Sequence, residues 1–554
     1  MKITVSELIV RYLERLGIDH IFGMPGAHVL PIYDRLRDSS VRSVLVKHEQ
    51  GAAFMACGYA RIARRPSACI ATAGPGATNL VTGIANAYAE RLPVLAITGE
   101  TSTYLFGRGG LQESSGEGGA IDQAALFSSI TRYRRLIERT GYVGQVLNQT
   151  TQALLGRAPG PVLLSIPYDV QKESVDAGVL EQIHFPQEST LRETTPAEAL
   201  AALIQSSRHP VIVAGYGCIA SDARDTVAAI SERFNIPVAT SLKAKGVVTE
   251  GSPLSLGCLG VTSNGDAYRY ITEHADLMIV LGASFNERTS HVWDPRLLDG
   301  KTIAQVDRNA DQLGRVFQPQ LAICGDIRIT LEHVYTALEA SATPPRSLDP
   351  LDVHRTSPPP HRKGAGGEDE EKFRLIRLFF EALARRFPRD ALVFDDNIVF
   401  AQSYYDVSDR NHYFPNTGIS SLGHAIPAAI GGRCFAPGSA TFAILGDGGF
   451  QMCGMEMMTA RNYGIPLNVV VINNGTLSLI RKNQFQLYGE RYVDCDFVNP
   501  DFGLLAQAFG ARHYLVQNEA DLAALFTGAD LTGALNLIEI PLDKHAFPRY
   551  LSSR

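Results

Sequence analysis

The sequence predicts an α/β protein made of three Rossmann-like units, each built around a parallel sheet. Short apolar runs of strand length alternate with amphipathic helical segments along most of the 554 residues. Strands that alternate with helices form parallel sheets, which bind ligands at the carboxyl ends of their strands. Hydrophobic residues make up 45% of the chain and charged residues 19%, values typical of a globular protein with a large core.

The first unit is expected to span residues 1–170. Its opening segment has the pattern of an amphipathic helix and lacks the uninterrupted apolar core of a signal peptide. Further helices are expected at 51–61 and after Pro75. The apolar runs that we expect to form strands are 44–46, 68–72, 94–98 and 162–166.

Two further units are expected, at residues 190–342 and 373–554. Between them, residues 343–372 are rich in proline, glycine and charge, cannot bury enough apolar surface to form a core, and are expected to be a linker. The second unit opens with a strand from His209 that enters a glycine turn. The remaining expected strands are 277–282 and 302–306 in the second unit, and 392–394, 440–445, 467–472 and 537–540 in the third.

Charge and hydropathy exclude several classes of partner. The 51 Lys and Arg residues against 57 Asp and Glu residues give a net charge of −6, which argues against a nucleic-acid-binding protein. No apolar run approaches the ~18 residues that span a bilayer, so we expect no membrane partner and a cytoplasmic protein. The eight cysteines form no CxxC pair and are expected to be buried free thiols.

The strongest chemical signal lies in the third unit. An apolar strand ends in the turn GDGG (446–449), and a helix is expected from about Glu456. The next strand ends at Asn474, 27 positions after Asp447, which leaves room for one helix and one strand between them. Both side chains are therefore expected at the carboxyl ends of parallel strands. Their oxygens suit Mg²⁺, which prefers hard ligands and binds diphosphates, and a helix start would meet the diphosphate charge.

Two weaker signals lie in the first unit. Glu49 stands where an apolar strand turns into a helix, in the segment KHEQGAA. The segment GPGATN, residues 74–79, is a glycine turn that opens the next helix. Neither segment is specific by itself, because the helix dipole favours a glutamate at any helix start and glycine turns are common.

Together these segments resemble the thiamine diphosphate (ThDP) enzymes of the acetolactate synthase, pyruvate oxidase and 2-oxo acid decarboxylase type. The resemblance covers essentially the whole chain and is acetolactate synthase-like. The motifs that carry it are FGMPGAHVLPIYDRL (22–36), KHEQGAAFMACGYAR (47–61), TAGPGATNLVTGIANAY (72–88), GRGGLQE (107–113), SSLGHAIPAAIGG (420–432) and the GDG and NN segments.

The resemblance implies roles for these residues. ThDP is an electron sink, and Glu49 is implied to hydrogen-bond its aminopyrimidine ring, so that the ring relays a proton from the thiazolium carbon. The Ser420 carbonyl is implied to accept the exocyclic N–H, and Leu422 to hold the cofactor bent. The implied Mg²⁺ ligands are Asp447, the Asn474 side chain and the Thr476 carbonyl. The Gly448 and Gly449 N–H groups are implied to contact the diphosphate. The other residues implied to contact the cofactor are Pro25, Thr72, Asn79, Asn397, Gly446 and Leu479.

The residues expected near the substrate leave the reaction open. His28 stands where acetolactate synthases have a small residue, and is a candidate catalytic residue that handles a proton or holds the substrate. Gln112 is a second candidate, which can donate to a carboxylate or an oxyanion. Asn483 stands where those enzymes have a tryptophan, so we expect a more polar acceptor pocket.

The leading hypothesis is a ThDP- and Mg²⁺-dependent carboligase that decarboxylates a 2-oxo acid such as pyruvate and transfers the acyl carbanion to a carbonyl acceptor. The alternatives are a 2-oxo acid decarboxylase without ligation, and an acyl transferase similar to sulfoacetaldehyde acetyltransferase. The resemblance implies that two subunits share each cofactor, in a homodimer or a homotetramer. It also makes FAD a candidate ligand of the second unit, although Leu259 and Asn286-Glu287 depart from the family pattern.

Overall fold

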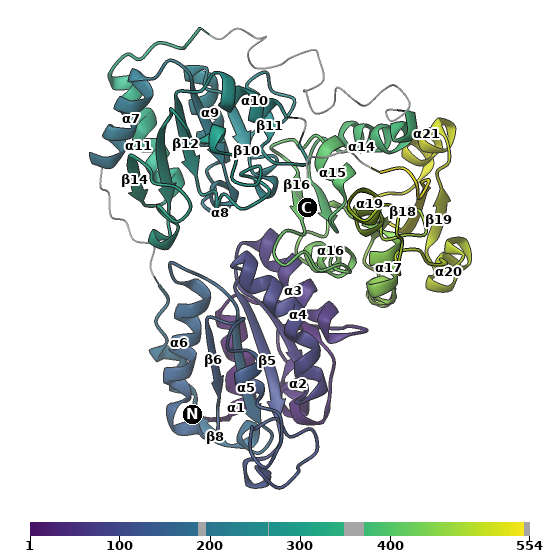
Figure 1. The fold of residues 1–554 in the computed structure, drawn as a ribbon. Coiled ribbons are helices and arrows are strands. Elements are labelled where there is room, and N and C mark those ends of the chain that lie inside the picture. Colours follow the sequence, from purple (N-terminus) through teal and green to yellow (C-terminus); the bar gives the residue numbers. More distant parts are fainter. Residues whose placement is uncertain (187–194, 264, 348–370, 548–554) are drawn as a thin grey trace.

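The three expected sheets are present in the computed structural model, which describes residues 1–186, 195–263, 265–347 and 371–547. Each unit contains a six-stranded sheet whose paired strands run parallel, with helices along its faces. Figure 1 shows the first unit in purple to blue, the second in teal and the third in green to yellow. The predicted α/β fold class is confirmed.

The first unit opens with a short strand that the sequence pattern does not predict. β1 (Lys2–Thr4) pairs antiparallel with β8 (Ser174–Asp176). Helix α1 (Val5–Arg15) follows, and the Thr4 hydroxyl caps it by accepting from the Glu7 N–H. The main sheet has the order β3-β2-β4-β5-β7-β6. Its elements are β2 (His20–Gly23), α2 (Leu30–Leu36), β3 (Arg42–Leu45), α3 (Glu49–Ala63), β4 (Ser67–Ala71), α4 (Pro75–Glu90), β5 (Val94–Glu100), β6 (Tyr133–Leu136), α6 (Val143–Leu155) and β7 (Val162–Pro167).

The second unit has the strand order β11-β10-β9-β12-β13-β14. Most of the expected linker lies outside the described residues. Its first residues contact this unit, because the Thr343 hydroxyl accepts from Gln205 and the Arg346 N–H donates to the Phe234 carbonyl. The elements are α7 (Thr195–Ser206), β9 (Pro210–Ala214), α8 (Tyr216–Ala220), α9 (Arg224–Phe234), β10 (Val238–Thr240), β11 (Ser255–Cys258), α10 (Asp266–Glu273), β12 (Leu277–Leu281), β13 (Thr302–Asp307), β14 (Leu321–Cys324) and α11 (Ile327–Ala340).

The third unit has the order β16-β15-β17-β18-β20-β19. The helix expected from about Glu456 is present as α18, which begins at Met457, and a further helix, α17, begins at Asp447 directly after the strand. Gly448 and Gly449 lower the helix propensity of this segment and predict a turn, yet they lie in the first turn of α17. The elements are α14 (Arg374–Arg386), β15 (Ala391–Asp395), α15 (Val399–Tyr404), β16 (His412–Pro415), α16 (Ala425–Phe435), β17 (Ala440–Gly446), α17 (Asp447–Cys453), α18 (Met457–Asn462), β18 (Leu467–Asn473), α19 (Ser478–Leu487), α20 (Phe502–Phe509), β19 (Arg512–Leu515), α21 (Glu519–Gly528) and β20 (Leu535–Pro541).

The first and third units share one hydrophobic core. Helix α3 packs against α16, as Figure 1 shows, and one apolar cluster includes Phe22 and Met55 together with Phe394 and Ile430. The helices approach closely enough that a Cβ atom on Gly58 would lie 1.9 Å from the Ala428 carbonyl oxygen. The two units therefore form one packed body.

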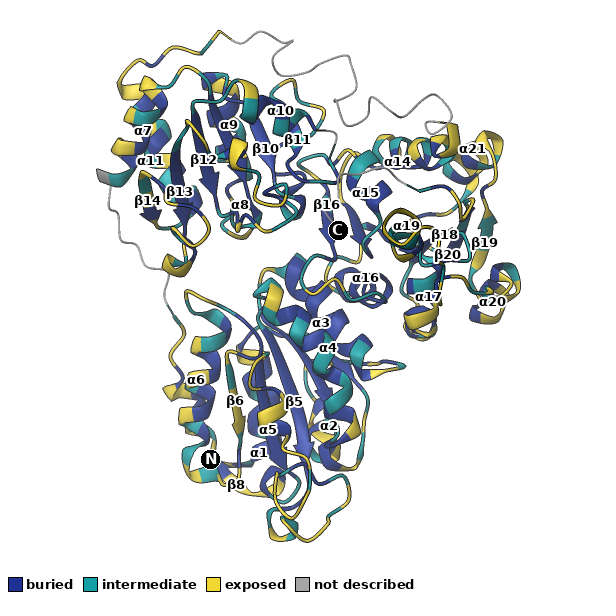
Figure 2. Cartoon of the chain, viewed as in Figure 1, coloured by how far each residue is buried: buried dark blue, intermediate teal, exposed yellow. Residues whose placement is uncertain are grey.

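Burial follows the expected pattern. In Figure 2 the strands are mostly dark blue, and exposed residues concentrate on outer helix faces and loops. Six of the eight cysteines are buried, as expected for all of them, whereas Cys434 is half-buried and Cys324 is exposed on the edge strand β14. Within the described ranges, no helix has the length and apolarity needed to cross a membrane.

Candidate functional site

The first cluster of predicted site residues surrounds Glu49. This glutamate begins α3, is buried, and accepts a hydrogen bond at Oε2 from Asn79 Nδ2 (2.9 Å). A Cβ atom on Gly76 would lie 3.4 Å from Glu49 Oε1 and 2.9 Å from Thr72 Cγ2. The glycine turn that opens α4 thus leaves room beside the carboxylate, which a side chain would fill.

His28, Thr72 and Gln112 lie together in the same unit. His28 Nδ1 is 3.3 Å from Thr72 Oγ1, and that hydroxyl donates to Gln112 Oε1 (3.2 Å). Since the hydroxyl proton goes to Gln112, His28 Nδ1–H is the donor to Thr72, which leaves Nε2 as a proton acceptor. Burial lowers the pKa of His28, so the imidazole is neutral at pH 7. Pro25 lies in the same loop, where a Cβ atom on Gly26 would be 2.5 Å from Thr72 Cβ.

The second cluster centres on Asp447, at the carboxyl end of β17. Its buried Oδ2 accepts from the N–H groups of Asn474 (3.0 Å) and Gly475 (2.6 Å), and from Asn499 Nδ2 (2.7 Å). Its Oδ1 accepts from the Gly448 N–H (2.9 Å). Asp447 and Asn474 therefore meet at the sheet edge, as the 27-residue spacing predicts. Asn499 is a contact that sequence reasoning missed.

The predicted metal ligands form one turn. Asn474 Oδ1 accepts from the Thr476 N–H (3.3 Å), and Asn474 Nδ2 donates to Ser478 Oγ (2.6 Å). Carboxylate, amide and carbonyl oxygens are the hard donors that Mg²⁺ prefers, so the residues present fit this ion. The part of the chain that the structure describes holds no group of three or more His, Cys, Asp and Glu side chains suited to a metal. This agrees with a donor set in which Asp447 alone carries charge.

A third group, predicted to contact the aminopyrimidine ring, lies on the turn before α16. Asn397 Nδ2 donates to the Ser420 carbonyl (3.2 Å), and both residues have positive φ angles, 64° and 56°. A carbonyl oxygen has two lone pairs, so this oxygen retains capacity for a second donor. Leu422 follows in the same turn and is half-buried.

Asp396 joins this turn to the diphosphate helix and was not predicted. Its Oδ2 accepts from the Gly423 N–H (2.7 Å), and a Cβ atom on Gly449 would lie 2.7 Å from the same oxygen. Burial raises the pKa of Asp396 to about 7, with the neighbouring Asp395 acting in the same direction. Asp396 therefore holds the turn before α16 and lies against Gly449, and the sequence pattern does not reveal it.

The remaining predicted residues occupy the same edge of the sheet. Gly446 ends β17, and Leu479 lies half-buried in the first turn of α19. A Cβ atom on Gly448 would be 2.7 Å from Leu477 Cδ2, so a larger residue would make that leucine side chain shift. Among the hydrogen bonds of the described residues, none joins the Glu49 cluster to the Asp447 cluster within the chain.

The second unit offers little open space at its predicted FAD segments. A Cβ atom on Gly215 would lie 2.1 Å from the Gly282 carbonyl oxygen, so these two turns pack directly on each other. Leu259 is buried in an apolar cluster, and Asn286 Oδ1 accepts from the Thr289 N–H (3.1 Å). These side chains have structural contacts of their own.

Comparison with known proteins matches each unit to one domain of a single family. Residues 3–125 match the N-terminal TPP binding domain of thiamine pyrophosphate enzymes, residues 197–334 the central domain, and residues 397–540 the C-terminal TPP binding domain. The acetolactate synthase large subunit of Corynebacterium glutamicum is 32% identical over 526 residues, which cover 92% of this chain and 82% of that protein. This chain belongs to the thiamine pyrophosphate enzymes. Thiamine pyrophosphate is the same compound as ThDP.

Other relatives of this thiamine pyrophosphate enzyme carry the same name. The probable acetolactate synthase large subunit of Methanocaldococcus jannaschii is 30% identical over 556 residues, or 97% of this chain and 92% of that protein. The acetolactate synthase large subunit of Lactococcus lactis is 29% identical over 540 residues, or 94% and 89% of the two chains. The family resemblance stated from the sequence motifs is confirmed.

Proposed function

We propose that this enzyme is a ThDP- and Mg²⁺-dependent carboligase, which decarboxylates pyruvate or a related 2-oxo acid and transfers the acyl group to a second carbonyl compound. One observation carries the proposal. Glu49 with Asn79, and Asp447 with Asn474, occupy strand ends in a chain that aligns over more than nine-tenths of its length with acetolactate synthase large subunits.

Each cluster has a task in this proposal. ThDP, when bound, supplies an electron sink for the carbanion that decarboxylation produces. Glu49 would hold a proton at the aminopyrimidine ring, with Asn79 fixing its carboxylate. Asp447, Asn474 and Thr476 would hold Mg²⁺ through their oxygens, and the Gly448 and Gly449 N–H groups would bind the diphosphate. Asn397 would position the Ser420 carbonyl toward the ring.

The group formed by His28, Thr72 and Gln112 would bind the substrate. The neutral imidazole of His28 can take a proton at Nε2 from a water or hydroxyl group, or from a protonated carbonyl substrate. The Gln112 amide can donate a hydrogen bond to a substrate carboxylate. The same imidazole favours a second candidate function, a 2-oxo acid decarboxylase in which His28 handles the proton that replaces CO₂.

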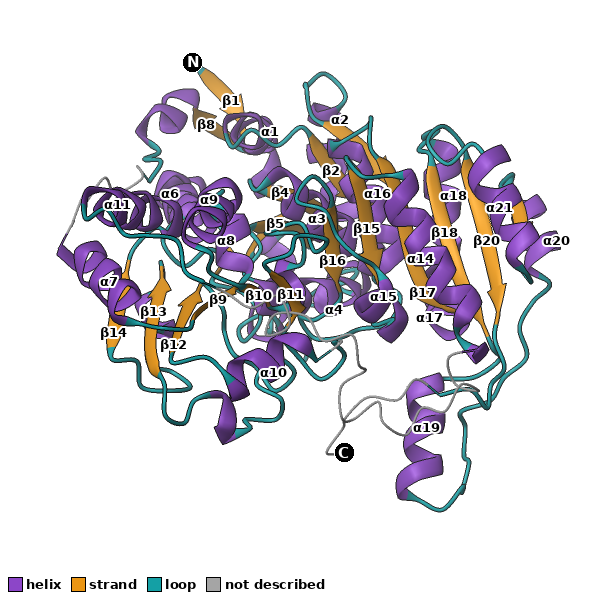
Figure 3. Cartoon of the chain, turned by 90° about the horizontal axis from the view of Figure 1, so that it is seen from above, coloured by secondary structure: helices purple, strands orange, loops and turns teal. Residues whose placement is uncertain are grey.

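The cofactor site is proposed to form between two copies of the chain. The first and third units of one chain pack through α3 and α16, while the Glu49 and Asp447 clusters sit on separate units. Helix α19 projects from the third unit in Figure 3 and carries the exposed apolar side chains Ile480, Phe485 and Leu487. An apolar face beside a site is typical of a surface that another subunit covers.

The decisive experiment incubates the purified protein with ThDP, Mg²⁺ and a panel of 2-oxo acids, with and without aldehyde or ketone acceptors. Ligated products formed in proportion to the CO₂ released would support the carboligase. Free aldehyde as the main product would instead establish the decarboxylase, and an acyl phosphate formed with inorganic phosphate would establish the transferase. Glu49→Gln is expected to abolish each of these reactions while ThDP still binds.

Absorbance of the same preparation tests the second unit. Flavin bands would establish FAD as a ligand there. A preparation without them, together with full activity, would make the second unit a spacer that packs against the other two.

A further inference from the structure

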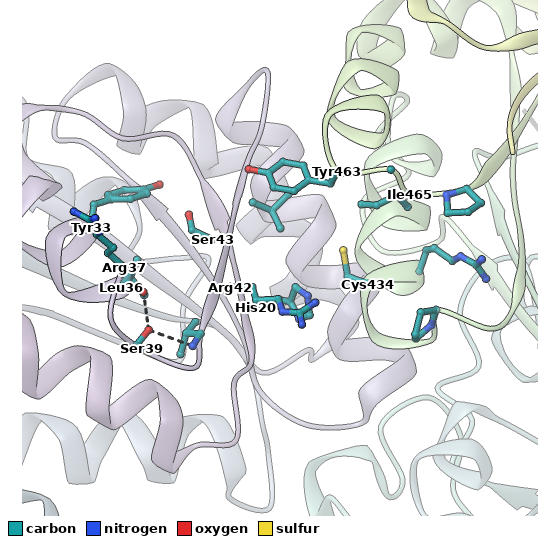
Figure 4. A pocket seen from close by; sticks show the side chains of 16 residues that line it. His20, Tyr33, Leu36, Arg37, Ser39, Arg42, Ser43, Cys434, Tyr463 and Ile465 are labelled. Atoms are coloured by element: carbon teal, nitrogen blue, oxygen red, sulfur yellow. Dashed lines mark hydrogen bonds between the residues drawn. The ribbon is translucent and has the colours of Figure 1, made fainter. Parts of the chain in front are cut away.

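A pocket lies between the first and third units, and its lining contains none of the predicted site residues. It has a volume of about 680 Å³, within the range of small-molecule pockets. Figure 4 shows side chains of the first unit, among them Tyr33 and Arg42, facing Tyr463, Cys434 and Ile465 of the third unit. Both units are needed to form it.

The charges in this pocket are all of one sign. Arg37, Arg42 and Arg433 line it, and its lining contains neither aspartate nor glutamate. No described carboxylate forms an ion pair with any of the three guanidinium groups. Asp19 and Arg42 both lie close enough to Cys434, on the opposite wall, for their charges to act on the pKa of that thiol, in opposite directions, and Asp19 is paired with Arg65 (2.8 Å). Three unpaired guanidinium groups around one cavity favour a ligand with several negative charges.

Arg433 is a fixed part of the pocket's third-unit wall. Its side chain is buried, and its two Nη atoms donate to the backbone carbonyls of Ser439 and Thr532. Its Nε–H has no hydrogen-bond partner in the part of the chain that the structure describes. This nitrogen is closed off from the cavity, so a ligand there would meet the charge of Arg433 and not its Nε–H. The backbone contacts also fix the guanidinium in place, so little entropy is lost when a ligand binds.

The pocket runs beside the edge strand β3 from its amino end, and no residue predicted to hold ThDP lines it. His20 is the first residue of β2 and Arg42 the first of β3, while Tyr463–Pro466 lead into β18. The carboxyl ends of the same strands lead to Pro25, Glu49 and Asn474. A ligand in this pocket therefore does not compete with ThDP.

We propose that this pocket binds a phosphate-bearing small molecule, with Arg37, Arg42 and Arg433 around the phosphate and the tyrosine and aliphatic side chains against its organic part. Phosphate matches the guanidinium fork in charge and geometry better than a single carboxylate does. Tyr33, Tyr463 and Ile465 supply the apolar walls that an organic group would contact. The inference does not depend on which reaction the enzyme catalyses.

Calorimetric titration tests this proposal with ADP and with inorganic pyrophosphate as probes. The protein is first saturated with ThDP in excess Mg²⁺, so that the proposed diphosphate site is occupied. The double variant R37A/R42A removes two exposed side chains and is expected to fold as the wild type does. R35A is the matched control, because Arg35 lies on the same helix, α2, pairs with Asp34 (3.6 Å) and does not line the pocket.

We expect one saturable site for at least one probe, weakened about tenfold or more by R37A/R42A and unchanged by R35A. Absence of saturable binding of both probes would overturn the proposal, as would equal affinities of R37A/R42A and R35A. Sedimentation velocity provides a further test. If R37A/R42A changes the oligomeric state and leaves probe binding intact, the pocket is an interface between subunits and the proposal is wrong.

Discussion

The side chain of Glu456, in the third unit, accepts a hydrogen bond from the backbone N–H of His48, the residue before Glu49 (3.1 Å). The same oxygen, Oε1, accepts from the Lys47 N–H (3.0 Å), and Oε2 accepts from Thr459 Oγ1 (2.6 Å). A Cβ atom on Gly51 would lie 2.3 Å from Oε1. The third unit thus fixes the start of α3, and with it the carboxylate proposed to act on ThDP.

Replacement of Glu456 is expected to affect stability and turnover together. Glu456→Ala leaves the part-buried N–H groups of Lys47 and His48 without their acceptor, which should lower the free energy of unfolding by about 1 kcal/mol or more. Glu49 would then be less well positioned, so kcat should fall more than the affinity for ThDP. Urea denaturation and steady-state kinetics measure the two effects. Glu456→Gln keeps an oxygen acceptor and should recover most of both, and wild-type values for Glu456→Ala would refute this role.

Asn499 is expected to tune the metal site without binding the metal. Its Nδ2 donates to Asp447 Oδ2, so Asn499→Ala removes one of the four donors that orient that carboxylate. Loss of such a supporting contact typically costs 10–100-fold in metal affinity, so the Kd for Mg²⁺ in the presence of ThDP should rise about tenfold or more.

The matched control for Asn499 is Gln451→Ala. Gln451 is exposed and donates to Asn499 Oδ1 (2.8 Å), so its loss leaves the contact between Asn499 and Asp447 in place. A Mg²⁺ titration of ThDP binding measures both variants. Equal Mg²⁺ affinities for the two variants would show that Asn499 does not support the site.

The two site clusters could be predicted to different extents from the sequence. Asp447 and Asn474 follow apolar strand runs, and local periodicity is enough to bring strand ends of one parallel sheet together. Asn499 and Asp396 act through contacts between segments that no local pattern relates, so their roles could not be predicted. The fold class follows from the alternation of strands and helices. The shared core of the first and third units does not, because it depends on Gly58 of α3, which meets the Ala428 backbone, and on Gly431 of α16, which meets the Met55 backbone.

Substitution of Gly58 tests that shared core. An alanine Cβ would lie 1.9 Å from the Ala428 carbonyl oxygen, and this neighbour is backbone, so α3 and α16 must separate. We expect Gly58→Ala to lower the free energy of unfolding by about 3 kcal/mol or more. Gly438→Ala is the control, because a Cβ atom there meets nothing within 4 Å. Matching unfolding midpoints for the two variants would contradict the close packing of the two helices.

His412 is expected to make the protein acid-sensitive. Burial lowers the pKa of His412 to about 4, and the charges of Arg224 and Arg64 act in the same direction. In the unfolded chain a histidine titrates near 6.5, so between pH 6.5 and pH 4 the unfolded state binds the proton first. The stability contributed by the neutral His412 is therefore complete above pH 6.5 and is lost as the pH falls toward 4. The loss amounts to about 3 kcal/mol.

His412→Gln removes this titration. As the pH falls from 6.5 toward 4, the wild type should therefore lose about 3 kcal/mol of unfolding free energy relative to the variant. Urea denaturation at pH 7 and at several values down to pH 4.5 measures the shift. The exposed His184 takes the same substitution as a control. The buried acids Asp395 and Asp396, whose pKa values burial raises to about 6 and 7, act in the opposite direction, because the native state binds their protons first. Only the difference between variant and wild type isolates His412, and a pH-independent difference would show that the pKa of His412 is the same in the native state as in the unfolded chain.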